Sequence, residues 1–104
     1  SDTNLKNSKL FSADLYGANL TNADLSGADL SNADLQRANL RNTKFDGANL
    51  SNISIHYSNL DNVDLSTASN FKIDAKYPVP VETCPKLMPK GWVCEDKEIK
   101  KINL

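Results

Sequence analysis

The chain has 104 residues, which is enough for one domain and too little for a catalytic domain with a separate binding domain. Its formal net charge of −1 argues against a nucleic-acid binder held by a basic surface. No apolar run is long enough to cross a bilayer. Asn and Leu each occur 13 times, which is unusual for Asn and indicates an internal repeat. We therefore expect a soluble repeat protein with no membrane insertion and no direct contact with nucleic acid.

From Leu5 to Leu65 a large apolar residue occupies every fifth position of the sequence. This period matches neither the 3.6-residue turn of an α-helix nor the two-residue repeat of a strand. A helix would spread these residues over all its faces and bury none of them well. The period therefore predicts a chain that turns a corner every five residues. The apolar centres are Leu5, Leu10, Leu15, Leu20, Leu25, Leu30, Leu35, Leu40, Phe45, Leu50, Ile55, Leu60 and Leu65.

Each five-residue unit divides into a straight stretch and a corner. A small residue, a polar residue and the large apolar centre form three extended residues, whose first and third side chains point the same way. The second residue after each centre is often Gly or Asn, as in Gly27 and Asn32. These residue types best tolerate a positive φ, so this position is predicted to lie at the corner.

Four such sides in each coil would stack residues that are twenty apart, at the ~4.8 Å spacing of paired strands. Two columns of asparagine then result, and stacked amides of this kind hydrogen-bond along a column. Opposite charges also meet, because Arg41 faces Asp61 and Lys9 faces Asp29. The two predicted columns are Asn19, Asn39 and Asn59, and Asn22, Asn42 and Asn62.

The repeat Ala23-Asp24-Leu25-Ser26-Gly27 and its copies resemble the pentapeptide repeat family. The resemblance covers residues 1–71 and implies an all-β fold, a right-handed quadrilateral parallel β-helix with Leu, Phe and the small residues inside. Thirteen sides would make about three coils. One residue is inserted before Phe71, so the last coil is expected to be wider or distorted.

The segment 72–104 loses the repeat and is predicted to be a carboxy-terminal cap over the final coil. It contains four prolines and a set of scattered apolar residues. We expect a short strand from Gly91 to Cys94. The run from Glu95 to Ile102 fits either a strand or one or two helical turns.

Cys84 and Cys94, the two cysteines of the chain, both lie in this cap. The favoured interpretation is a disulfide, and the alternatives are two buried free thiols or half of a metal site. Zinc is disfavoured because the single histidine, His56, lies in the repeat region. A disulfide would place the protein outside the cytoplasm, in a periplasm, a lumen or the extracellular space, and its absence would indicate the cytoplasm.

The sequence carries no signal peptide and begins almost in register, at Thr3 and Leu5, as a processed protein would. The first coil then has no visible cap over its leucines. Three interpretations stand: a removed capping segment, a few polar residues that suffice, or a homodimer through the N-terminal coil.

No arrangement of residues points to catalysis. The Ser and Asp residues occupy the outward positions of the repeat, and a rod filled with Leu and Ala has no interior pocket. No phosphate-binding loop or metal-ligand spacing occurs. We therefore expect a non-enzyme with no cofactor, no bound metal and no small-molecule substrate.

One set of long side chains stands out on the predicted surface. Stacking places Tyr16, Gln36 and His56 in one column and Arg37 beside Tyr57 in the next. Tyr and Arg are enriched in interface hot spots, and Arg over Tyr also forms a cation–π pair. We interpret Tyr16, Arg37, His56 and Tyr57 as a candidate partner-binding face, with His56 as a solvent-exposed imidazole. The alternative is that these side chains merely cover corners of the rod.

The leading functional hypothesis is a non-catalytic interaction module with an unidentified protein partner, as the family resemblance implies. The alternative, also implied by the family, is a DNA mimic that binds a type II topoisomerase, as the quinolone-resistance type does. This chain departs from that type because residues 1–71 carry a net charge of only −3, from five Lys or Arg and eight Asp or Glu.

Overall fold

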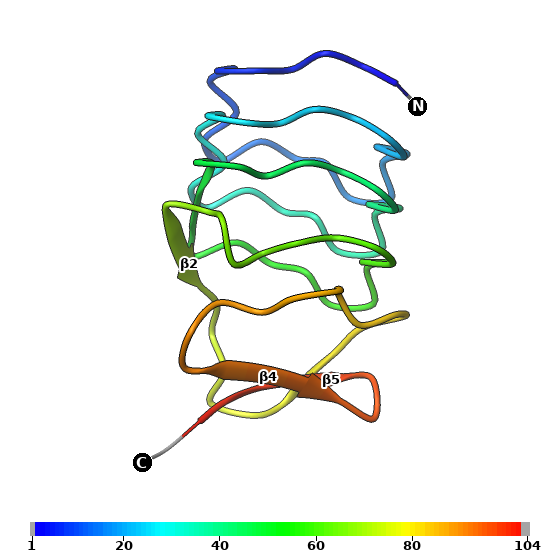
Figure 1. The fold of residues 1–104 in the computed structure, drawn as a ribbon, viewed down its shortest axis with the longest axis vertical. Coiled ribbons are helices and arrows are strands. Elements are labelled where there is room, and N and C mark those ends of the chain that lie inside the picture. Colours follow the sequence, from blue (N-terminus) through cyan, green and yellow to red (C-terminus); the bar gives the residue numbers. More distant parts are fainter. Residues whose placement is uncertain (1, 103–104) are drawn as a thin grey trace.

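A computed structural model of the chain describes residues 2–102. The chain winds through stacked loops from the amino-terminal end to the carboxy-terminal end (Figure 1). Parallel bridges join residues twenty apart, for example Asn4 with Asp24 and Asp24 with Lys44. The described residues contain strands and bridges and no helix. The predicted β-helix class is therefore confirmed, with four five-residue sides in each coil that the twenty-residue bridges join.

The sides alternate as the sequence predicts. In the side that contains Ala33, Asp34 and Leu35, the first and third residues are fully buried and Asp34 is half-buried. Residues two apart in an extended stretch share one face, so every side contributes two side chains to the shaft. The core is apolar with few polar members, because this selection repeats in every coil from Leu20 onward.

The corners adopt the left-handed conformation at the predicted position. Gly27 and Asn32 have φ values of 71° and 61°. The corner N–H of Asn32 donates to the carbonyl oxygen of Ser51 on the next coil at 2.9 Å. The polar residue of each side also stabilises its corner, since Oδ1 of Asp34 accepts from the backbone N–H of Gln36 at 3.0 Å. Such Asx turns favour the abrupt change of direction.

The two asparagine columns differ. At the corner, Asn42 donates to Asn22 and accepts from Asn62, both at 2.9 Å, which confirms the predicted ladder. In the other column, Oδ1 of Asn39 instead accepts from the backbone N–H of Arg41 at 3.2 Å. A residue just before a corner has a backbone donor two positions on, and this local bond competes with stacking.

The corner glycines offer a test of the stacking. A Cβ at Gly27 would overlap Oδ1 of Asn7 on the neighbouring coil, whereas a Cβ at Gly47 would meet nothing. Both glycines have a φ near 70°. We expect Gly47→Ala to cost about 1 kcal/mol of unfolding free energy from the left-handed conformation alone. Gly27→Ala should cost about 0.5 kcal/mol more in urea unfolding, since the exposed side chain of Asn7 must also change its rotamer. Equal losses, or a difference that survives Asn7→Ala, would contradict the stacking.

The last coil is wider than the others, as the inserted residue predicts. Strand β1 (Asn49–Ser51) pairs in parallel with β2 (Asn70–Lys72) at a spacing of 21 residues. Asn59 then bridges to Thr83, 24 residues on. The spacing thus grows from 21 to 24 residues, so three more residues are inserted between Lys72 and Thr83. Within residues 2–102, the column of Asp14, Asp34 and Ser54 has no continuing bridge on this wide coil.

A small antiparallel sheet covers the carboxy-terminal end of the shaft (Figure 1). Its order is β3 (Val79–Pro80), β5 (Glu98–Lys101) and β4 (Trp92–Glu95). The open alternative for 95–102 is thus settled as a turn and a strand. Asp96 and Lys97 form the turn with φ values of 52° and 61°. Ile99, at the centre of the sheet, is fully buried.

The division into 1–71 and 72–104 stays a prediction. Its boundary falls inside β2, and residues 1, 103 and 104 lie outside the described residues. Strand β3 makes hydrogen bonds both to the repeat region and to the cap. The carbonyl oxygen of Pro80 accepts from the backbone N–H of Tyr57 in the repeat region, and β3 pairs with β5 in the cap. We refer below to β4 and β5 as the lid.

Cys84 and Cys94 form the predicted disulfide, with Cα atoms 5.8 Å apart. Cys84 follows Thr83, which is bridged to Asn59 on the coil above. Cys94 lies in β4. The disulfide therefore attaches the lid covalently to the wide coil.

Candidate functional site

The structure brings Tyr16, Arg37, His56 and Tyr57 together at one corner of the rod, and we call these four residues the tyrosine corner. The backbone N–H of Gly17 donates to the carbonyl of Gln36, and that of Arg37 donates to the carbonyl of His56, both at 2.9 Å. These bonds stack the corners of three successive coils, in the columns that the sequence predicts.

Arg37 lies over the ring of Tyr57, with Cζ 4.8 Å from the ring centroid. The predicted intramolecular cation–π pair is therefore present, and such an exposed pair contributes about 0.5–1 kcal/mol. Tyr16 and Tyr57 remain 55% and 49% exposed, so both rings offer contact area to solvent. The pair fixes the Tyr57 ring without burying it.

The expected exposure of His56 is wrong. The side chain is half-buried, and its Nδ1 is buried without a hydrogen-bond partner. The reason is that the wide coil continues below this corner, where the next residue, Tyr57, donates its N–H to Pro80 at 2.8 Å. The histidine therefore lies between two coils, and the exposed surface of the tyrosine corner consists mainly of Tyr16, Arg37 and Tyr57.

The backbone of the tyrosine corner contradicts local preference. Arg37 and Tyr57 have φ values of 58° and 60°, in the left-handed region that large side chains rarely adopt. At most equivalent positions of other corners the chain has Gly or Asn, as in Gly27 and Asn42, and Ser12 is a small exception with a φ of 57°. The conformation costs an L-residue on the order of 1–2 kcal/mol. Arg37 and Tyr57 thus occupy positions where smaller residues would stabilise the rod more.

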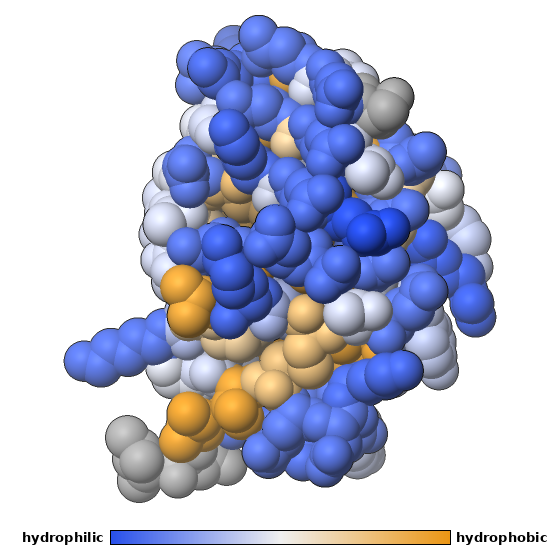
Figure 2. Space-filling view, turned by 45° about the vertical axis from the view of Figure 1, so that its right-hand side comes forward, coloured by the Kyte–Doolittle hydropathy of each residue, from blue (hydrophilic) through white to orange (hydrophobic). Residues whose placement is uncertain are grey.

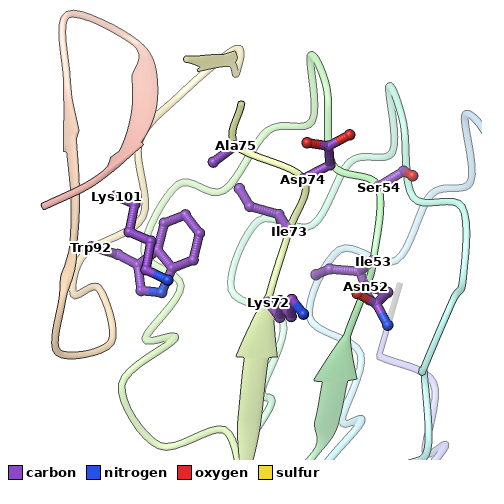
Figure 3. Close-up of a pocket in the computed structure, with 9 residues that line it drawn as sticks. All are labelled: Asn52, Ile53, Ser54, Lys72, Ile73, Asp74, Ala75, Trp92 and Lys101. Carbon is purple, nitrogen blue, oxygen red and sulfur yellow. The ribbon is translucent and has the colours of Figure 1, made fainter. Parts of the chain in front are cut away.

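A pocket lies between the wide coil and the lid, and sequence reasoning missed it. It has a volume of about 410 Å³. Figure 3 shows Ile73 and Trp92 facing one another across it. Apolar groups also gather in a band near this end of the rod, between hydrophilic surfaces (Figure 2). The inserted residue before Phe71 was the available signal, because it predicts a distorted coil. We call this cavity the lid pocket; its walls are formed by Asn52, Ile53, Ser54, Lys72, Ile73, Asp74, Ala75, Trp92 and Lys101.

The outward face of the rod is polar and locally paired. Within residues 2–102 the ion pairs are Lys6 with Asp24 and Arg41 with Asp61 on the rod and Lys100 with Glu95 in the lid, at 3.5 to 3.7 Å. The predicted contact of Arg41 with Asp61 is thus confirmed. Lys9 is bridged to Asp29 through the backbone, but the two charges form no ion pair.

Hydrogen bonds lower the pKa of two carboxyl groups on the rod. For Asp29 the main cause is the backbone N–H of Ser31, at 3.0 Å, followed by the Ser31 hydroxyl, at 2.8 Å. For Asp24 the hydroxyl of Ser26 comes first and its backbone N–H second. These bonds are made to the charged form of the carboxyl and therefore favour it.

Ser31→Ala should raise the pKa of Asp29 part of the way toward 3.8, because the backbone donor remains. A lowered pKa in the folded state stabilises the fold above the unfolded pKa, and this stabilisation is lost as the pH falls through the folded pKa. The variant should therefore lose stability at pH 6 and little or none at pH 2. Carbon-detected NMR titration measures the shift.

Ser51→Ala provides the control, since Ser51 makes the same two bonds to Asn49, which does not titrate. Its loss of stability should not depend on pH. If Ser31→Ala also lost the same stability at every pH, the hydrogen bonds from Ser31 would not favour the charged form of the Asp29 carboxyl over the protonated form.

The described part of the chain shows no group of three or more His, Cys, Asp or Glu side chains that could hold a metal ion. Nor does any helix within residues 2–102 have the length and apolar character needed to traverse a membrane.

The family model described as pentapeptide repeats (8 copies) matches residues 1–37 and 33–69. The matched region is the part of the chain that forms the regular four-sided coils. The chain belongs to the pentapeptide repeat family.

Among solved structures, the chain is similar to the crystal structure of a pentapeptide repeat protein from the thylakoid lumen of Arabidopsis thaliana. The two chains are 26% identical, and the alignment covers 67% of this chain and 66% of the other, with a TM-score of 0.23. The chain thus spans just under two thirds of that protein's length. A search of curated proteins found no match.

Proposed function

We propose that the protein is a non-catalytic interaction module that binds a partner protein through the tyrosine corner. The observation that carries the proposal is the left-handed backbone of Arg37 and Tyr57. The cation–π pair of Arg37 and Tyr57 offsets only part of the cost of this conformation, and residues that break a local backbone preference without an equal gain are expected at functional positions. Tyr and Arg are also the residue types that dominate binding energy at protein interfaces.

The architecture supports this function because core and surface are separate. The shaft is filled by the small and large residues of each side, and the corner side chains contribute little to it. Corner residues are therefore free to vary for recognition while the rod keeps its shape. Membership of the pentapeptide repeat family fits the same function.

The test combines Arg37→Asn with Tyr57→Asn, since Asn occupies the equivalent corner positions in Asn32 and Asn42. The variant should fold at least as stably as the parent. A photo-reactive residue at Tyr16 should form discrete adducts in the native compartment, and these adducts should disappear in the double variant. The same reactive residue at Asp46, on the diagonally opposite corner, is the control. Equal adducts from both positions, or adducts that survive the double variant, would overturn the proposal.

The DNA-mimic alternative is not favoured. A mimic of duplex DNA needs a continuous acidic stripe, and Lys6 and Arg41 each neutralise an aspartate of the rod. A gyrase supercoiling assay separates the two functions, because a module of the proposed kind leaves the enzyme unaffected. Inhibition that responds to charge reversal of Asp24 and Asp61 would favour the mimic.

We also propose a homodimer through the first coil. Leu5, Leu10 and Leu15 are half-buried there, and Phe11 is 60% exposed. Sedimentation equilibrium should then show a dimer that Phe11→Ser weakens. A monomer at high concentration would remove this proposal and leave the tyrosine corner unaffected.

The disulfide supports a location outside the cytoplasm, in a periplasm, a lumen or the extracellular space. Thiol labelling of the native protein should find both cysteines blocked until a reductant is added. For the winding, we propose right-handed coils, about three of them before the cap, because connections between parallel strands are overwhelmingly right-handed.

A further inference from the structure

The lid pocket lies where a ladder of the rod ends. Bridges to the wide coil continue on the sides of Asn49, Asn59 and Asp64. Among residues 2–102, the side that carries Ser54 has no such bridge. Ser54 lines the pocket, and its side of the rod runs directly into His56 and the tyrosine corner. The pocket and the corner therefore lie along one surface.

The floor of the lid pocket is apolar and rigid. Ile53 and Ile73 are buried, and Trp92 is half-buried opposite them. The Trp92 ring packs edge-on against Phe71, with ring centroids 5.2 Å apart. This contact holds the tryptophan in place, so an entering side chain meets a preformed wall.

The rim of the lid pocket carries an excess of positive charge. Lys72 comes from the wide coil and Lys101 from the lid, and both are exposed. The Nζ of Lys101 lies 5.8 Å from the centroid of the Trp92 ring. Asp74 is the one acidic residue among the lining residues, which leaves a net charge of +1. An apolar group with carboxylates nearby complements this arrangement.

We propose that the lid pocket binds an extended segment of a partner protein that carries an apolar side chain between two acidic residues. In an extended segment, side chains two apart share one face, so acidic residues two positions before and after the apolar one would reach Lys72 and Lys101. A volume of about 410 Å³ accommodates one large side chain and its backbone. The assignment rests on the proposed function, because it names the chemistry of the partner.

The test uses the peptide acetyl-Glu-Val-Phe-Val-Glu-amide with the full chain. Trp92 is the single tryptophan, so its fluorescence reports occupancy of the lid pocket directly. We expect a dissociation constant on the order of 0.1–1 mM. Replacing both Glu by Gln, or Phe by Ser, in the peptide should weaken binding about tenfold.

Variants of the protein locate the contact. Lys72→Gln and Lys101→Gln should each weaken binding about two- to fivefold, and Asp74→Asn should strengthen it about twofold. Lys76→Gln, an exposed lysine outside the pocket, should change nothing. These substitutions are on the surface and leave the core unchanged.

Three results would overturn the proposal: no fluorescence change at millimolar peptide, equal binding of the Gln peptide, or tighter binding of 3-phenylpropionate, which would make the pocket a small-acid site. Arg37→Asn and Tyr57→Asn should leave binding of this peptide unchanged. Failure of the tyrosine corner and failure of the lid pocket are therefore distinguished by separate variants.

Discussion

Leu35→Ala is expected to lower the free energy of unfolding by about 3–4 kcal/mol. Leu35 is fully buried and lies between Leu15 on the coil above and Ile55 on the coil below. The cavity left by the truncation cannot close, because backbone hydrogen bonds fix the spacing of the coils at both sides of it. Urea denaturation followed by circular dichroism measures the loss.

Leu10→Ala is the matched control, since Leu10 has the same place in the repeat but is only half-buried. We expect it to cost about half as much. If both variants lost the same free energy, burial in the shaft would not determine stability, and the description of the core would be wrong.

Removal of the disulfide, by reduction or by combined Cys84→Ser and Cys94→Ser, is expected to cost about 2–3 kcal/mol. The cross-link closes a loop of sequence separation 10, so the constraint it places on the unfolded chain is modest and calculable. The lid should respond first, because β4 contributes Cys94 and the disulfide attaches it to the wide coil. The measurement is thermal unfolding followed separately by Trp92 fluorescence and by far-ultraviolet circular dichroism.

Chemical reduction and the double serine variant both remove the disulfide, so each serves as a control for the other. The reduced parent protein and the double serine variant should unfold at the same temperature. Added reductant should not change the unfolding temperature of the variant. An unfolding temperature that does not change in either case would show that the lid is held by its hydrogen bonds and apolar contacts alone.

Much of the rod could be predicted from the sequence because one short rule repeats. Ala23 and Leu25 are buried and Asp24 is not, as a two-residue alternation requires. The position of Gly27 in the repeat predicted the left-handed corner, and register alone predicted the ladder through Asn42. Each coil repeats the same contacts, so a residue that departs from the repeat at one position does not change the fold that the other repeats predict.

The exceptions arose where two interactions compete for one group. Asn39 was expected to bond along its column, but the backbone N–H of Arg41 is closer in sequence and forms the bond. His56 was expected in solvent, but the inserted residues below it change the path of the chain. The period of the repeat predicts neither of these two differences.

The lid was predicted only in outline because it has no period. The turn at Asp96 and Lys97 has two left-handed residues, and Lys is not a residue type that signals such a turn. The antiparallel pairing of Ile99 with Val79 joins segments twenty residues apart, and no repeat in the sequence indicates its register. The lid pocket depends in turn on that pairing, so sequence reasoning could not place Trp92 and Lys101 opposite Ile73.

Because each coil has four sides of five residues, an insertion in the rod changes its length and also rotates the part that follows about the rod axis. A duplicated block of twenty residues in the middle of the rod would separate Tyr16 from Trp92 by a further ~4.8 Å and keep both on their original sides. A block of five would instead rotate everything downstream by a quarter turn and carry the lid pocket away from the tyrosine corner. Natural or designed length variants should therefore keep the tyrosine corner and the lid pocket on one face only when they change by whole coils.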